Sequence, residues 1–161
     1  MTTIPITFIT KSVGLVFAQQ ATDEFNLKNN CKDSFLKTFK LLTILLAPPF
    51  IILLLFGPNI FEFIFGVNWR VAGEYVQILS IMFYLRAITS PLTYIFIIVN
   101  KQNEDFWLHI LTLILISACL YLSSIYLKNV KGTLVFYSIS YSCIYLYYLY
   151  RAYTLSTKKL N

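Results

Sequence analysis

Long apolar runs constrain this 161-residue chain more than any other feature of its sequence. Four segments carry few or no charges over at least about 18 residues, the length that an α-helix needs to cross a bilayer core of about 30 Å. They are residues 39–56, 71–99, 106–127 and 132–150. Continuous runs of this length predict helices, because strands of a membrane barrel would show about ten residues of alternating pattern.

The composition agrees with a lipid environment. Hydrophobic residues make up 58% of the chain and charged residues only 12%, against about 25% charged residues in soluble domains. We therefore predict an all-α, polytopic transmembrane helix bundle with four complete spans. A short partial helix is expected at residues 4–20, followed by a basic, amphipathic, cytoplasmic segment at 21–38. The whole chain, 1–161, would form a single membrane domain.

The net charge of +6 is distributed as in membrane proteins. The basic residues lie mostly between or beyond the apolar runs, which is the pattern that orients membrane helices. A nucleic-acid-binding protein would gather them into one patch, so no nucleic-acid partner is expected. With the N-terminus inside, eight Lys and Arg fall on the inner side: Lys28, Lys32, Lys37, Lys40, Lys101, Arg151, Lys158 and Lys159. Three fall outside, Arg70, Lys128 and Lys131, so both termini are predicted to be cytoplasmic.

Residues for catalysis or metal binding are scarce. The cysteines Cys31, Cys119 and Cys143 are far apart and form no CxxC motif or Cys/His pair. The single histidine, His109, is better explained as a hydrogen-bonding anchor near the membrane surface than as a ligand or base. Paired carboxylates, a phosphate-binding glycine loop and zinc-ligand spacing are not found. We therefore predict no enzymatic activity, no cofactor and no metal, with membrane lipid as an expected partner.

Arg86 is the most informative polar residue, because it lies midway along the second predicted span. A guanidinium there costs at least about 2.5–3.5 kcal/mol on insertion scales. At the helical period, four other polar residues share its face: Thr89, Ser90, Thr93 and Asn100. Such a face suits a cationic site for an anionic substrate, with Arg86, Ser90, Thr93 and Asn100 as candidate binding residues. It equally suits a structural arginine that pairs with a carboxylate or carbonyl on another helix, and Glu74 is too far off the stripe to be that partner.

Tyrosines form a second stripe in the last span. Tyr137, Tyr141, Tyr145 and Tyr148 are spaced by four, four and three residues, which places them along one side of a helix. Packing against neighbouring helices is the simpler interpretation. A surface on which sugar rings stack is the alternative.

Residues 57–101 carry a family resemblance. The features that carry it are Phe65-Gly66, Trp69, Ala72-Gly73, Ile78-Leu79, Ser90-Pro91-Leu92 and the loop 100–102. In these features the chain resembles the C-terminal half of Wzx-type O-antigen flippases, which belong to the multidrug/oligosaccharidyl-lipid/polysaccharide exporter superfamily. The upstream segment IPITFITKSVGLVFAQQA and the tyrosine-rich last span with its basic tail are similar as well.

The resemblance implies two lobes of helices around a central cavity. It also implies movement of undecaprenyl-diphosphate-linked oligosaccharides across the bacterial inner membrane for lipopolysaccharide and other surface polysaccharide biosynthesis. This chain would supply the last four helices, and the missing N-terminal helices would be its partner. Arg86 would then be a cavity cation near the diphosphate. The alternatives are a membrane-embedded polysaccharide polymerase or glycosyltransferase, or a truncated, non-functional remnant or assembly partner.

Overall fold

The structure is a computed structural model that describes residues 3–127 and 129–157, with side chains for 11–123 and 129–157. Every regular element within these ranges is helical, and no strand occurs among them, which confirms the all-α prediction. The elements are α1 (Thr3–Lys28), α2 (Lys32–Phe65), the 3₁₀ turn η1 (Val67–Trp69), α3 (Arg70–Leu92), α4 (Tyr94–Ile98), α5 (Gln102–Leu127) and α6 (Val130–Thr157).

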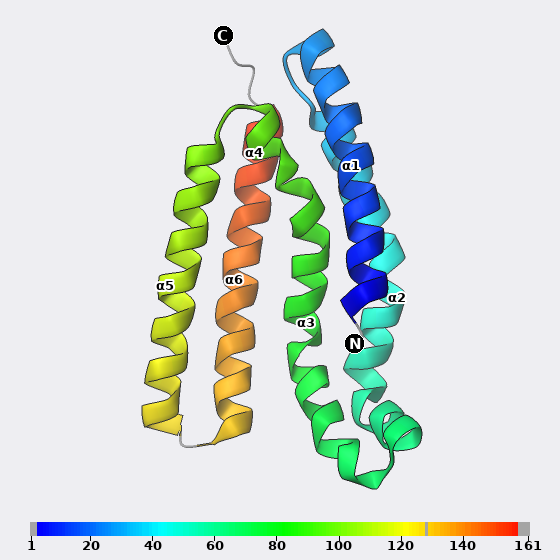
Figure 1. Cartoon of the computed structure of the whole chain (residues 1–161), viewed down its shortest axis with the longest axis vertical. Helices are drawn as coiled ribbons and strands as arrows, with labels where there is room; N and C mark the ends of the chain where they lie inside the picture. Colours follow the sequence, from blue (N-terminus) through cyan, green and yellow to red (C-terminus); the bar gives the residue numbers. More distant parts are fainter. Residues whose placement is uncertain (1–2, 128, 158–161) are drawn as a thin grey trace.

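The long helices run side by side along one axis (Figure 1). α6 lies between α5 and α3, and α1 and α2 lie on the other side of α3. The α1–α2 and α4–α5 connections share one end of the bundle with the C-terminal end of α6, here called the upper end. The α2–α3 and α5–α6 connections lie at the opposite, lower end. The long helices α1, α2, α3, α5 and α6 therefore alternate in direction along the chain, as short connections require.

Among the described residues, three helical stretches are long and apolar enough to cross a membrane: Lys32–Phe65, Val67–Ile98 and Gln102–Ser123. Many of their large apolar side chains face outward; Ile44 is 63% and Leu113 69% exposed. Helices that are apolar around their whole circumference belong in lipid when they are not buried in protein. The fourth predicted span, 132–150, is helical within α6 but does not reach the same hydropathy, because it is rich in serine and tyrosine. Membrane insertion of residues 132–150 stays a prediction.

The predicted boundary between a partial helix at 4–20 and a separate segment at 21–38 is not observed. α1 continues to Lys28, and the chain turns at Asn29, whose φ of 53° is the left-handed conformation that commonly ends a helix. The rest of the predicted segment 21–38 then forms the start of α2. Glu24, only 8% exposed, joins the two helices, because its carboxylate accepts hydrogen bonds from the backbone N–H groups of Asp33 (3.3 Å) and Ser34 (2.8 Å). The partial helix is thus longer than expected, and no separate segment follows it.

The pair Gly57-Pro58 is a turn signal in the sequence and predicts a turn between the first two spans, but α2 continues through it to Phe65. Gly57 and Gly73 bring α2 and α3 into close contact there. A Cβ atom on Gly73 would lie 2.5 Å from the Cα of Pro58 and 2.6 Å from the carbonyl oxygen of Gly57. The turn was predicted from local residue preference, and close packing against α3 overrides that preference.

The second predicted span, 71–99, contains a break near its upper end. α3 ends at Leu92, and the short α4 follows after Thr93. Pro91 lies in the last turn of α3 and has no N–H with which to continue the hydrogen-bond ladder. This break places Asn100 in the turn after α4, where its φ is 54°.

Candidate functional site

The polar face of α3 borders a groove between α3, α5 and α6. The groove has a volume of about 240 Å³. Its lining is rich in hydroxyl groups: Arg86, Thr89, Ser90 and Thr93 come from α3, His109 and Thr112 from α5, and Tyr141, Ile144, Tyr145 and Tyr148 from α6. The two polar stripes recognised in the sequence, on α3 and on α6, therefore line the same groove. We call it the Arg86 groove.

Three of the four candidate binding residues lie in this groove. Arg86, Ser90 and Thr93 line it together, and Thr89 of the same stripe lies beside them. Asn100 does not, because the break after Leu92 moves it into the turn that leads to α5. Counting at 100° per residue placed Asn100 on the stripe by assuming an unbroken helix.

The Arg86 side chain is exposed, and it forms no ion pair with any carboxylate of the described residues. Glu74 pairs instead with Lys131, at 2.5 Å. The phenols of Tyr137 and Tyr145 lie within electrostatic reach of the guanidinium. Within the described chain, the charge of Arg86 therefore remains available to a group from outside it.

The tyrosine stripe forms a ladder of rings along α6. Tyr137 and Tyr141 meet edge to face at 5.1 Å between ring centroids, and Tyr141 and Tyr145 stack at 5.2 Å with 26° between their planes. Tyr148 is 4% exposed and packs against Phe96. Tyr148 is thus a packing residue, whereas the half-buried Tyr141 and Tyr145 present part of their surface to the groove.

Thr89 differs from Thr93 and Thr112 because its hydroxyl makes no hydrogen bond to a backbone carbonyl of its own helix. Its side chain is 1% exposed, and its Oγ1 makes no hydrogen bond within the described chain. By contrast, Thr93 donates to the carbonyl of Ser90 (2.8 Å) and Thr112 to that of Leu108 (2.7 Å). A buried hydroxyl without a partner costs free energy.

His109 connects α5 to α6, as expected of an anchoring residue. Its Nδ1 lies 2.7 Å from the Tyr148 hydroxyl and 2.9 Å from the backbone carbonyl oxygen of Asp105. The ring also borders a second hollow of about 370 Å³, which shares Ser90 and Thr93 with the Arg86 groove and reaches Lys11 on α1. The sequence placed Lys11 inside an apolar stretch, but nothing local indicated that it lies near Ser90.

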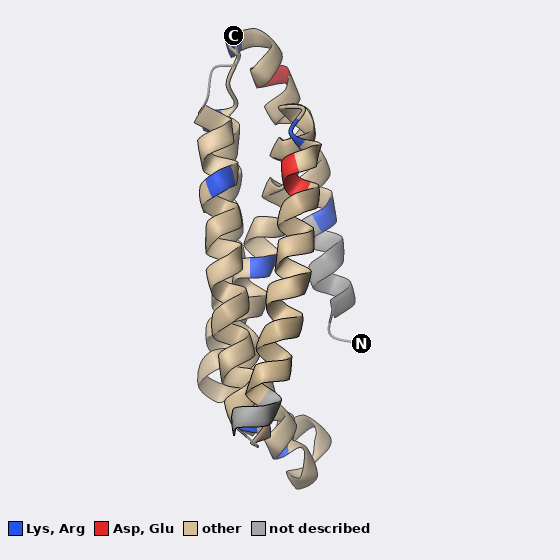
Figure 2. Ribbon diagram, turned by 90° about the vertical axis from the view of Figure 1, so that its left-hand side faces the viewer, with Lys and Arg blue, Asp and Glu red and all other residues tan. Residues whose placement is uncertain are grey.

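The ion pairs between described residues lie toward the two ends of the bundle. At the lower end Glu62 binds Arg70 (2.6 Å), and the hydrogen bond from Lys131 to Glu74 raises the pKa of Lys131. At the upper end Glu104 binds Arg151. Figure 2 shows one side of the bundle, on which few charged residues lie away from the ends. Among the residues described, no cluster of three or more His, Cys, Asp or Glu could hold a metal ion.

Comparisons with known proteins do not place the chain in a family. No protein-family model, no curated protein and no solved structure matches it. The residues of the Arg86 groove and the apolar helices around it are therefore the basis for a functional proposal.

Proposed function

We propose that the chain is part of a membrane transporter for an anionic amphiphile, and that the Arg86 groove binds the polar part of this substrate. The observation that carries the proposal is the exposed guanidinium of Arg86, which has no carboxylate partner among the described residues and lies between apolar helices. An arginine in the middle of a membrane span is expensive and is retained where it faces a cavity or a pathway.

The groove residues suit a phosphorylated sugar carrier. A phosphate accepts paired hydrogen bonds from a guanidinium. The exposed hydroxyl of Ser90 lies on the same face and can donate to a further oxygen. Tyr141 and Tyr145 offer aromatic surface and hydroxyl groups for a sugar ring, while the lipid tail of the substrate remains in the bilayer. Together with the family resemblance, these features favour a lipid-linked oligosaccharide, such as undecaprenyl-diphosphate O-units.

In this proposal the chain acts as the C-terminal part of a flippase in the bacterial inner membrane. No covalent bond is made or broken, and the substrate passes from the cytoplasmic to the periplasmic leaflet. The described helices enclose the groove only in part, so further helices of the same transporter are proposed to complete it and to alternate its access.

Substitutions at Arg86 test the proposal in a flippase-deficient strain that expresses the chain together with the remaining helices. Arg86→Ala is expected to abolish surface polysaccharide export at near-normal protein abundance. Arg86→Lys should retain part of the export, because a cation remains. Arg70→Ala is a matched control, since Arg70 is exposed and pairs only with Glu62 at the lower end among the described residues.

Abundance and export have to be measured together, because they separate the two interpretations of Arg86. A structural arginine with a buried carboxylate partner on another helix would leave that partner uncompensated in Arg86→Ala, at a cost of about 3–5 kcal/mol. Protein levels would then fall along with export. Normal export by Arg86→Ala would rule out both interpretations.

A further inference from the structure

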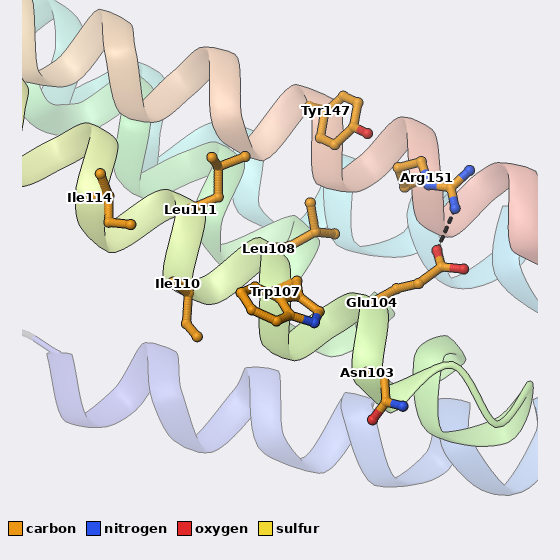
Figure 3. A pocket seen from close by; sticks show the side chains of 9 residues that line it. All are labelled: Asn103, Glu104, Trp107, Leu108, Ile110, Leu111, Ile114, Tyr147 and Arg151. Carbon is orange, nitrogen blue, oxygen red and sulfur yellow. Dashed lines mark hydrogen bonds and ion pairs between the residues drawn. The ribbon is translucent and has the colours of Figure 1, made fainter.

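A third hollow, apart from the Arg86 groove and the hollow beside Lys11, lies between α5 and α6 and has a volume of about 580 Å³. It shares no lining residue with the groove. Figure 3 shows Leu108 and Leu111 of α5 pointing toward α6, with Tyr147 on the facing helix. Trp107, 67% exposed, lies at the same level. We call this hollow the α5–α6 channel.

The channel is polar at one end only. From Trp107 to Ile114 its lining is apolar over about 10 Å of helix, which is about a third of the hydrocarbon thickness of a bilayer. Toward the upper end it finishes at Asn103, Glu104 and Arg151. Trp107 and Tyr147 lie where the two parts meet, as aromatic residues do at the boundary between headgroups and acyl chains. Such a channel matches an amphiphile with a single polar end.

The polar end carries charges of both signs. One carboxylate oxygen of Glu104 binds one guanidinium nitrogen of Arg151 (Figure 3), and the other lies 3.8 Å from the ammonium of Lys101. The side chains of Glu104 and Arg151 are 35% and 30% exposed. A guanidinium has five N–H donors and a carboxylate has about four acceptor sites, so each group retains bonding capacity. Asp105 adds a further negative charge nearby.

We propose that the α5–α6 channel binds a phosphatidylethanolamine-type lipid of the bilayer. One acyl chain lies along Leu108, Leu111 and Ile114, the phosphate binds Arg151, and the primary ammonium binds Glu104. A zwitterionic headgroup complements this pair of charges, whereas an anionic headgroup leaves Glu104 facing a like charge. The ammonium donates hydrogen bonds to the carboxylate, which a quaternary choline group cannot do.

Tryptophan quenching tests this inference in vesicles. The chain has two tryptophans, so Trp69→Phe leaves Trp107 as the only reporter. The protein is reconstituted in phosphatidylcholine vesicles that contain increasing amounts of phosphatidylethanolamine, phosphatidylglycerol or phosphatidylcholine with brominated acyl chains. Brominated phosphatidylethanolamine is expected to half-quench Trp107 at about a two- to fivefold lower mole fraction than the other two lipids, the factor that a partly exposed ion pair contributes.

Two further substitutions identify the contacts. Glu104→Gln should transfer the preference to phosphatidylglycerol, because Arg151 then lacks its carboxylate. Leu111→Phe should reduce quenching by filling the channel, whereas the control Leu113→Phe, at an exposed position that does not line the channel, should leave it unchanged. If the quenching of Trp107 depends on mole fraction in the same way for all three lipids, the inference is wrong. Equal or stronger quenching by phosphatidylglycerol in the Trp69→Phe protein would also overturn it, as would no quenching by any lipid, which would mean that a protein segment covers Trp107.

Discussion

The side-chain amide of Gln77 on α3 donates a 2.6 Å hydrogen bond to the backbone carbonyl of Leu54 on α2. Leu54 lies four residues before Pro58, which has no N–H to donate to that carbonyl. Proline is tolerated in membrane helices when a neighbouring helix satisfies the freed backbone group. Gln77 thus allows α2 to continue through Gly57-Pro58 as a helix.

Loss of this hydrogen bond should destabilise the contact between α2 and α3. Gln77→Leu is expected to lower the free energy of unfolding by about 1–2 kcal/mol, because it leaves the Leu54 carbonyl without a partner. Unfolding in mixed micelles measures the effect. In a Pro58→Ala background the backbone N–H returns, so the same substitution should cost clearly less. Equal costs in both backgrounds would contradict the proposed link between Gln77 and Pro58.

Removal of the Glu24 carboxylate should loosen the start of α2. Glu24→Ala is expected to cost about 1–2 kcal/mol of stability, since the carboxylate caps two backbone N–H groups and lies at the positive end of the helix dipole. Hydrogen exchange at the amides of Asp33 and Ser34 should accelerate. Asp23→Ala is the control, because Asp23 is exposed and neither of these bonds involves it. Unchanged exchange in Glu24→Ala would show that the cap is dispensable.

The buried hydroxyl of Thr89 should destabilise the fold. Thr89→Val keeps the shape of the side chain and removes a hydroxyl that has no partner within the described chain. The free energy of unfolding, measured in mixed micelles, should therefore rise by about 1–3 kcal/mol, the cost of a buried polar group without a hydrogen bond. Thr89→Ser, which keeps the hydroxyl, should show no such gain. A large loss of stability in Thr89→Val would mean that the hydroxyl already has a partner.

The membrane topology can be checked with reporter fusions. The eight-to-three distribution of Lys and Arg predicts that a reporter fused after Gln102 is cytoplasmic and one fused after Asn129 is periplasmic. A third fusion, after Thr157, tests whether α6 spans the bilayer despite its serines and tyrosines, and it should be cytoplasmic. The reverse pattern at the first two positions would reject the orientation. A periplasmic reporter after Thr157 would leave α6 outside the set of spans.

The sequence by itself determined the helical class and the two polar stripes. Apolar runs longer than a strand can use leave helices as the structure that pairs its own backbone groups in lipid. Arg86, Thr89, Ser90 and Thr93 fall on one face because the helical period is a local property of the chain. The spacing of the tyrosines in α6 follows from the same period. Where the helix breaks, as after Leu92, that local rule fails, and Asn100 leaves the stripe.

Only the tertiary structure determined which faces of the helices pack against one another. The stripes of α3 and α6 are separated by about fifty residues of chain, and each could have faced lipid, another helix or the other stripe. Glu24 reaching the start of α2, Gln77 reaching Leu54, and Lys11 approaching the hollow beside Ser90 depend equally on how neighbouring helices pack. Helical periodicity specifies the direction of a side chain around its own axis, whereas the rotation of one helix against another is set by close packing at their interface, as at Gly57 and Gly73.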